Sequence, residues 1–177
     1  MRILRTVSLL AAVALAAGVF ARATTLQLLD FNSLTLKSTA IVRGKVQVTR
    51  TTMQGSSIYT HYNVQVIEQW KGAPASQIDF VIPGGRINGY QQTVAGAPSL
   101  TNGQEYVLFL WTSRSRLTHI MGMSQGLFVS ANGVVTRPAL TEHLIDPNGA
   151  DASDPGMQMT LAAMRSAVQS VLKGNSQ

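Results

Sequence analysis

The most informative absence in this 177-residue chain is cysteine, of which there is none. Without thiols the protein can form no disulfide, offer no thiolate to a metal and carry no lipid on an N-terminal cysteine. Its stability must therefore come from its hydrophobic core, and a chain of this length is long enough to build one.

Side chains that could bind a metal are also few. The three histidines, His61, His119 and His143, lack the spacing of zinc ligands. Asp146 and Asp154 lie in a polar stretch without the regular Asp, Asn and Gly positions of a calcium loop. The sequence therefore predicts no metal and no cofactor.

Catalytic sets are missing in the same way. Ser124 is followed by Gln-Gly and lacks the Gly-x-Ser-x-Gly elbow of a serine hydrolase. Glu68, Asp79 and Glu105 are isolated from one another, so no pair of carboxylates for acid–base chemistry can be recognised. These absences predict a protein that is not an enzyme.

The first 23 residues have the features of a secretory signal peptide. Arg2 and Arg5 precede an apolar run over residues 7–20, and Ala21-Arg22-Ala23 fits a small-x-small cleavage signal. The alternative is a membrane anchor, but the run is short of the roughly 20 apolar residues that a spanning helix needs. We expect a secreted or periplasmic protein cleaved near Ala23, with no transmembrane segment afterwards.

Cleavage also changes the charge balance. Removing Arg2, Arg5 and Arg22 from the 14 basic residues leaves 11 against 8 acidic ones, so the net charge falls from +6 to +3.

The absence of cysteine in an exported chain is more typical of a bacterial envelope or extracellular protein than of a eukaryotic secreted module.

Residues 58–82 carry the clearest β pattern. Apolar and polar residues alternate from Ile58 to Val66, and the apolar phase then slips by one residue at Ile67. Such a slip predicts a β-bulge, which bends a strand as a barrel requires. Lys71-Gly72 follows as a turn, and a second alternating run ends at residue 82 before Pro-Gly-Gly.

The remaining elements are mostly strands framed by two helices. A continuous apolar run predicts a strand over residues 105–112 that is buried on both faces, and Asn132-Gly133 predicts a tight hairpin. Leu161, Met164 and Val168 recur at helical spacing, with Thr160 as a candidate cap. Further strands are expected over residues 40–52, 117–123 and 127–130, and a short helix over 26–36.

Several of these pieces together resemble the netrin-like, oligonucleotide/oligosaccharide-binding (OB) barrel of the tissue inhibitors of metalloproteinases. The matching stretches lie within residues 39–129. They include Ala40 to Val46, Trp70-Lys71-Gly72, Ile78-Asp79-Phe80, Glu105 to Leu108 and His119-Ile120. The layout, with Ser124 to Phe128 and a final amphipathic helix, is also similar to small uncharacterised bacterial secreted proteins.

This resemblance predicts the fold class and the domain limits. We expect a mainly β protein: a small closed five- to six-stranded OB-like barrel with a short N-terminal helix and a C-terminal amphipathic helix. The expected division is a signal peptide at 1–23, the barrel at 24–137, a polar linker at 138–158 and the helix at 159–174.

The predicted function is that of a secreted, non-enzymatic binding protein that engages another protein or an envelope component. Long loops without structure of their own are often functional, so we expect the contact surface on the glycine-rich loop 83–99, with the hairpin loop 53–57 beside it. The candidate partner-binding residues are Thr24, Arg86, Asn88, Tyr90 and Gln91.

Two alternatives stay open. Inhibitors of the resembled family chelate the protease zinc through an N-terminal cysteine, and here a free amino group at Thr24 would take that place without a disulfide to hold it. The second alternative is an oligosaccharide or single-stranded nucleic acid binder. It would use Arg43, Lys45 and Arg50 on one strand and Arg114 and Arg116 in one turn, with Tyr59 or Tyr90 stacking bases. The small net charge and the predicted export disfavour nucleic acid.

Overall fold

The structure is a computed structural model that describes residues 25–175, so the predicted signal peptide and Thr24 lie outside it. The protein is mainly β, with two α-helices, α2 (Phe31–Lys37) and α3 (Leu161–Gly174), and a 3-10 helix η1 (Met123–Gly126). The strands are β1 Thr25–Gln27, β2 Ala40–Gln54, β3 Ser57–Lys71, β4 Gln77–Pro83, β5 Gly85–Ile87, β6 Tyr90–Gln92, β7 Glu105–Thr112, β8 Thr118–Ile120, β9 Leu127–Ala131, β10 Val134–Arg137, β11 His143–Ile145, β12 Asp151–Ala152 and β13 Met157–Thr160.

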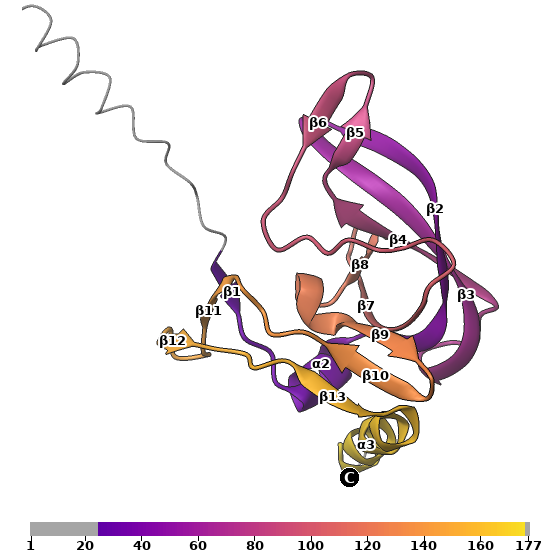
Figure 1. The fold of residues 1–177 in the computed structure, drawn as a ribbon, viewed down its shortest axis with the longest axis vertical. Helices are drawn as coiled ribbons and strands as arrows, with labels where there is room; N and C mark the ends of the chain where they lie inside the picture. The colour runs from indigo at the N-terminus through magenta and orange to yellow at the C-terminus, as the bar shows by residue number, and fades with distance from the viewer. Residues whose placement is uncertain (1–24, 176–177) are drawn as a thin grey trace, which may run out of the picture.

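Eight strands form the main sheet, in the order β13-β10-β9-β7-β2-β3-β4-β8 (Figure 1). The last strand, β8, pairs antiparallel with β7 and parallel with β4, where Val81 lies opposite His119. The pairings therefore run from β7 through β2, β3 and β4 to β8 and back to β7. We call these five strands the five-strand ring.

The ring can curve because β2 and β3 bend together. The register of this pair shifts where Arg43 faces Glu68 and Gly44 faces Val66, which leaves Ile67 as an extra residue. This is the β-bulge that the phase slip predicts. A Cβ on Gly44 would lie 2.2 Å from the carbonyl oxygen of Gln65, so glycine is required for the close backbone approach at this bend.

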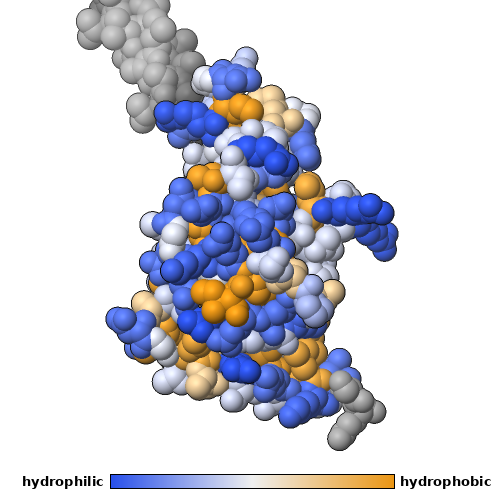
Figure 2. Space-filling model, turned by 90° about the vertical axis from the view of Figure 1, so that its right-hand side faces the viewer, coloured by the Kyte–Doolittle hydropathy of each residue, from blue (hydrophilic) through white to orange (hydrophobic). Residues whose placement is uncertain are grey.

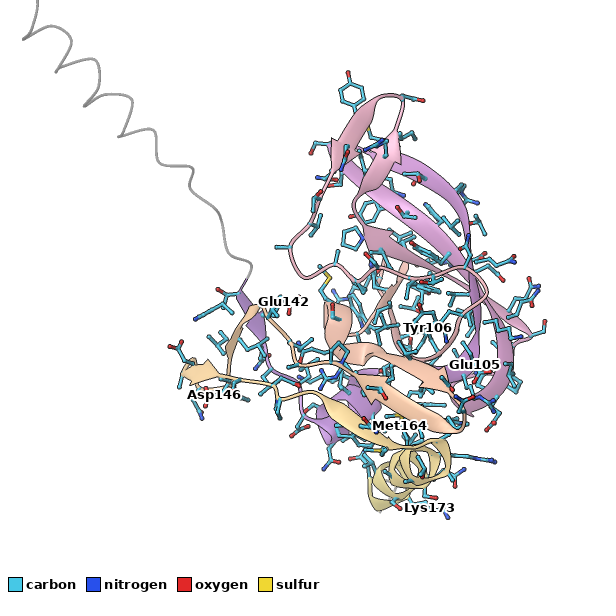
Figure 3. The ribbon with its side chains drawn as sticks, in the orientation of Figure 1. Glu105, Tyr106, Glu142, Asp146, Met164 and Lys173 are labelled. Atoms are coloured by element: carbon cyan, nitrogen blue, oxygen red, sulfur yellow. The ribbon has the colours of Figure 1, made fainter. Side chains whose placement is uncertain are left out.

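Two hydrophobic clusters lie on opposite faces of the sheet. Inside the ring, one cluster takes residues from all five strands, among them Val42, Val64, Phe80, Leu108 and Ile120. The other lies between the outer face of the sheet and the two helices: Leu34, Ile41, Trp70, Val107, Phe109, Phe128, Val135, Met164 and Val168. Figure 3 shows Met164 between α3 and the sheet above it. Strand β7 contributes to both clusters, so the prediction that it is buried on both faces is confirmed.

The Trp70-Lys71-Gly72 stretch joins helix α2 to the ring. Lys71 Nζ donates hydrogen bonds of 2.8 Å to the carbonyl oxygens of Thr35 and Leu36 at the C-terminal end of α2. A cation there also complements the negative end of the helix dipole. Gly72 turns the chain with φ of +96°, as the sequence predicts for this position.

The C-terminal helix has the predicted cap and ends as predicted, but it begins two residues later, at Leu161, because Met157–Thr160 forms β13. Thr160 Oγ1 accepts a hydrogen bond from the Ala163 amide at 3.1 Å, and Lys173 lies in the last turn. Within residues 25–175, no helix is long and apolar enough to cross a membrane.

The predicted N-terminal helix is wrong in its first half. The chain forms β1 first, where Leu26 pairs in parallel with Leu144, and α2 begins only at Phe31. Asp30 sets this start, because its Oδ1 accepts a hydrogen bond of 2.6 Å from the Ser33 amide. Pairing with a distant strand outweighs the helical spacing of the leucines.

The predicted strand over residues 117–123 is likewise too long. Strand β8 ends at Ile120, and Gly122, with φ of +62°, turns the chain into η1. The buried amide of Gln125 then accepts from the Leu29 amide at 2.7 Å and donates to the Gln27 carbonyl at 3.0 Å. The Ser-Gln-Gly motif thus ties η1 to the segment between β1 and α2.

Residues 138–158 are more than the polar linker that the sequence predicts. They contain β11, β12 and the start of β13, and Leu144 is fully buried. Arg137 Nη2 donates to Asp154 Oδ2 at 2.6 Å, and both side chains are buried. The local sequence does not reveal these strands, because β11 and β13 are stabilised by pairing with the distant strands β1 and β10.

We predict that Gly44→Ala costs about 1–3 kcal/mol of unfolding free energy, because the added methyl would overlap the Gln65 carbonyl and the Val64 side chain. The matched control is Gly174→Ala, whose Cβ would meet nothing within 4 Å. Chemical denaturation of both variants and the wild type measures the difference. Equal midpoints for Gly44→Ala and Gly174→Ala would contradict this account of the bend.

Candidate functional site

A groove lies on the outer face of the five-strand ring, where β8 meets β4 and β7. It has a volume of about 480 Å³. Its walls and floor come from segments far apart in the sequence and are mostly apolar: Tyr59, Val81, Pro83, Pro98, Trp111 and His119, with Met121 and Met123 at one end. We call it the aromatic groove.

Strand pairing explains how these side chains meet. Phe80, Leu110 and Ile120 point into the ring, so their neighbours Val81, Trp111 and His119 point outward. His119 lies directly opposite both Val81 on β4 and Trp111 on β7, and Tyr59 lies opposite Pro83. Trp111, His119 and Val81 thus form one row across three strands, and the Tyr59 ring joins this row diagonally, since Val81 itself pairs with His61 on β3.

The three rings of this row are in contact through His119. The imidazole centroid lies 6.0 Å from the Trp111 ring and 6.5 Å from the Tyr59 ring, tilted toward the first and edge-on to the second. Such aromatic pairs add about 0.5–1.5 kcal/mol beyond their buried area. The row is therefore a prearranged surface.

Trp111 is the most accessible large side chain of the groove. Two residues earlier on the same face of β7, Phe109 is fully buried and packs edge-on against Phe31 of α2 at 5.8 Å. Trp111 lies beyond the reach of that helix and keeps 42% of its surface exposed. An exposed indole beside an apolar groove is typical of a contact site.

The chemistry of the groove is that of an apolar surface with one imidazole. Burial lowers the pKa of His119, so the neutral ring is favoured at neutral pH. Across residues 25–175, no carboxylate or hydroxyl is hydrogen-bonded to this imidazole, so nothing orients it as a general base.

The residues predicted from the sequence lie elsewhere, on the β5–β6 hairpin. Arg86, Asn88, Tyr90 and Gln91 are all exposed there, and Arg86 Nη2 donates to Gln91 Oε1 at 2.5 Å. Figure 1 shows this hairpin at the end of the molecule remote from α3. The structure thus brings these four residues together, but not into the groove.

The hairpin and the groove are nevertheless neighbours in the chain. Pro83 and Pro98, which flank the segment containing the hairpin, both line the groove. A smaller and more polar cavity of about 290 Å³ lies beneath residues 92–100, and Thr60, Tyr62 and Gln92 contribute to it. The predicted binding loop therefore borders two cavities without filling either.

The three histidines are not brought together. His61 contacts Thr52 Oγ1 at 2.7 Å, His143 pairs with Asp151 at 3.1 Å, and His119 lies in the groove. Among the residues that the structure describes, no group of three His, Asp or Glu side chains could hold a metal.

The basic residues considered for nucleic acid are partly engaged within the protein. Arg43 lies between two carboxylates, with Nη1 at 2.5 Å from Glu68 Oε1 and Nε at 2.6 Å from Glu105 Oε1. The hydrogen bond from Arg43 helps to hold the pKa of Glu105 below its usual value, although burial alone would raise it. The carboxylate of Glu105, labelled in Figure 3, thus pairs with a guanidinium group that would otherwise be available to bind a phosphate.

The outer face of β2 and β3 is a poor alternative site. Figure 2 shows it as largely hydrophilic, with separate apolar residues rather than one patch. The exposed large hydrophobic side chains of these strands are Val48, Met53 and Ile67. Scattered apolar side chains of this kind are normal on a protein surface.

Sequence reasoning missed the groove and the hairpin for different reasons. Trp111 ends an apolar run, and only the position of α2 leaves it exposed. The hairpin had a usable signal, since Asn88-Gly89, with φ of 48° and 81°, is a strong two-residue turn sequence.

Comparisons of this chain with protein-family models, with curated proteins and with solved structures give no match. The site is therefore interpreted from its own geometry.

We predict that replacing His119 by Phe makes the protein less sensitive to mild acid. The folded-state pKa of His119 is lowered by burial, so the unfolded chain takes up the proton first as the pH falls below about 6.5. Wild-type stability should thus decline from pH 7.5 to 5.5.

Denaturant titrations across that range measure the slope. His61 has its pKa lowered by burial in the same way, so His119→Phe should retain part of the decline and His119→Phe with His61→Gln less still. An unchanged slope in His119→Phe would contradict the burial of this imidazole.

Proposed function

We propose that this chain is a secreted, non-enzymatic binding protein built on a closed OB-like barrel, and that it holds apolar side chains of a partner protein in the aromatic groove. The observation that carries the proposal is the row of Tyr59, His119 and Trp111 around an apolar groove of about 480 Å³. Recognition sites are typically apolar and aromatic with few polar groups.

The barrel is supported by the five-strand ring. Each strand of the ring pairs with two others of the ring, and all five place side chains in the same inner cluster. A small five-stranded barrel with an added hairpin and helix is the layout that the netrin-like resemblance implies, and OB barrels bind ligands over strands 2 and 3 and adjoining loops. Counted within the ring, these strands are β3 and β4, which contribute Tyr59, Val81 and Pro83 to the groove.

A protein partner fits the groove better than the alternative ligands. Saccharides and nucleic acids need several hydrogen-bonding or cationic groups, whereas the lining here is mainly aromatic, aliphatic, proline and methionine. The pairing of Arg43 with Glu68 and Glu105 further reduces the cations available to a phosphate backbone. Exposed Trp and Tyr are the residue types that dominate protein–protein binding energies.

The non-enzymatic part of the proposal is supported by the groove's own groups. It offers one imidazole and one phenol, and His119 has no hydrogen-bonded partner in the described part of the chain. Nucleophilic catalysis would need a nucleophile hydrogen-bonded to such a base.

The proposals of export and of protease inhibition depend on the N-terminal sequence alone. The signal-peptide features of residues 1–23 support secretion. Inhibition through the amino group of Thr24 stays a prediction, because that residue lies outside the described part of the chain.

The proposal predicts that peptides selected for binding to the full-length chain dock on the groove. Random peptides are displayed, selected against the wild type, synthesised and titrated. Truncation of an interfacial Trp commonly costs a large share of the binding energy, so Trp111→Ala should weaken the selected peptides at least tenfold. Tyr59→Ala should act in the same direction.

Ile67→Ala is the matched control, since Ile67 is 48% exposed on a strand of the same ring but does not line the groove. It should leave the affinities unchanged. Selected peptides that bind Trp111→Ala and wild type equally would contradict the groove, and loss only in Tyr90→Ala would move the site to the β5–β6 hairpin.

A further inference from the structure

Positive charge near one end of the aromatic groove restricts the chemistry of the partner that the groove could bind. The turn between β7 and β8 begins directly after the Trp111–His119 and Thr112–Thr118 pairs. It contains Arg114 and Arg116, both exposed. At about 3.3 Å per residue, Arg114 lies roughly 10 Å along the chain from Trp111. Both arginines can therefore reach a ligand that extends beyond the groove.

Neither arginine is neutralised by its own protein. Within residues 25–175, the ion pairs of arginine engage Arg43, Arg137 and Arg165, and none involves Arg114 or Arg116. This contrasts with Arg43, which lies between two carboxylates. Two unpaired guanidinium groups thus belong to the turn that joins Trp111 to His119 in the chain.

The turn is also held in a defined shape. The Ser113 amide donates to the Leu117 carbonyl at 2.8 Å, and the Arg116 amide donates to the Ser113 carbonyl at 3.0 Å. Arg116 has φ of +63°, a conformation that arginine adopts only when its surroundings impose it. The backbone bonds therefore fix where the two cations project from.

One carboxylate lies toward this end, and it does not cancel the two arginines. Asp79 precedes Val81 by two residues on the same outward face of β4, and its Oδ1 accepts a hydrogen bond of 2.8 Å from Asn63. Arg50 lies close by, because it pairs with His61 across β2 and β3. The local balance stays positive.

The other end of the groove has a different character. Pro83, Pro98, Met121 and Met123 line it, and all four are uncharged. The groove is thus polarised, with an apolar half and a half that leads to cations. A ligand that matches both halves must be apolar along one part and negatively charged at the part next to it.

Resting on the proposed function, we infer that the groove takes an extended polypeptide segment with apolar side chains followed by acidic residues. The apolar residues would contact Tyr59, His119 and Trp111, and the acidic residues would face Arg114 and Arg116. Complementary charges of this kind steer association and set the orientation of the bound segment.

The test uses one apolar peptide core, taken from the peptides that bind the groove. It is synthesised with a Glu-Glu, Gln-Gln or Lys-Lys extension at one end and again at the other. Each peptide is titrated into the full-length chain at low and at physiological salt. We expect a Glu-Glu extension at one end to bind at least tenfold tighter than Gln-Gln at low salt, and the gain to shrink as salt rises.

The variant Arg114→Gln with Arg116→Gln should abolish that gain while the Gln-Gln peptide binds as before. The control is Arg165→Gln with Lys173→Gln, which removes the same charge from α3 and should leave the gain intact. An unchanged unfolding midpoint in each variant verifies the fold.

The possible outcomes separate the two proposals. Equal binding of Glu-Glu and Gln-Gln peptides, a gain with Lys-Lys, or a gain that survives in the Arg114/Arg116 variant would overturn the acidic partner while leaving the groove in place. Peptide binding that does not depend on Trp111 would overturn the groove itself.

Discussion

The shared bend of β2 and β3 is the constraint on which the rest of the structure depends. Gly44 lets the two backbones approach where no side chain would fit, and the extra residue Ile67 takes up the difference in length between the strands. Because β2 then pairs with β3 along one edge and with β7 along the other, the sheet curls until β8 meets both β4 and β7. Lys71 continues the same effect at the end of β3, where its two hydrogen bonds hold α2 against the ring.

The candidate site is a consequence of this curvature and of where the helices stop. The outer face of β7 is covered by α2 at Phe109 and uncovered at Trp111, so the same strand supplies both core and surface. Its pairing with β8 places His119 beside Trp111, and the pairing of β8 with β4 carries the row on to Val81. Tyr59, opposite Pro83, reaches the His119 ring diagonally. Val81, Trp111 and His119 are thus each held by a strand that is itself buried on its inner face, which preorganises this part of the surface for binding.

Much of the fold could be predicted from local patterns. Alternation identified β2, β3 and β4, and a continuous apolar run identified β7. The phase slip identified the bulge at Ile67, and helical spacing with Thr160 identified α3. The errors came where distant segments decide the outcome. Leu26 pairs with Leu144 instead of joining a helix, and residues 138–158 acquire strands through β1 and the buried Arg137–Asp154 pair. The groove could not be predicted for the same reason, since its residues come from four strands, a loop and the segment that leads into η1. The residues that were predicted, Arg86, Asn88, Tyr90 and Gln91, share a hairpin because they share a short stretch of sequence.

The most direct measurement of the central claim, that β8 joins β4 to β7 and so assembles the aromatic groove, is the pattern of nuclear Overhauser effects from the His119 ring in the full-length chain. The account predicts contacts from this imidazole to both the Trp111 indole and the Tyr59 ring, whose centroids lie 6.0 and 6.5 Å away. Contacts to Trp111 without any to Tyr59 or Val81 would mean that β8 pairs with β7 alone. The sheet would then be open, and the groove would not exist as described.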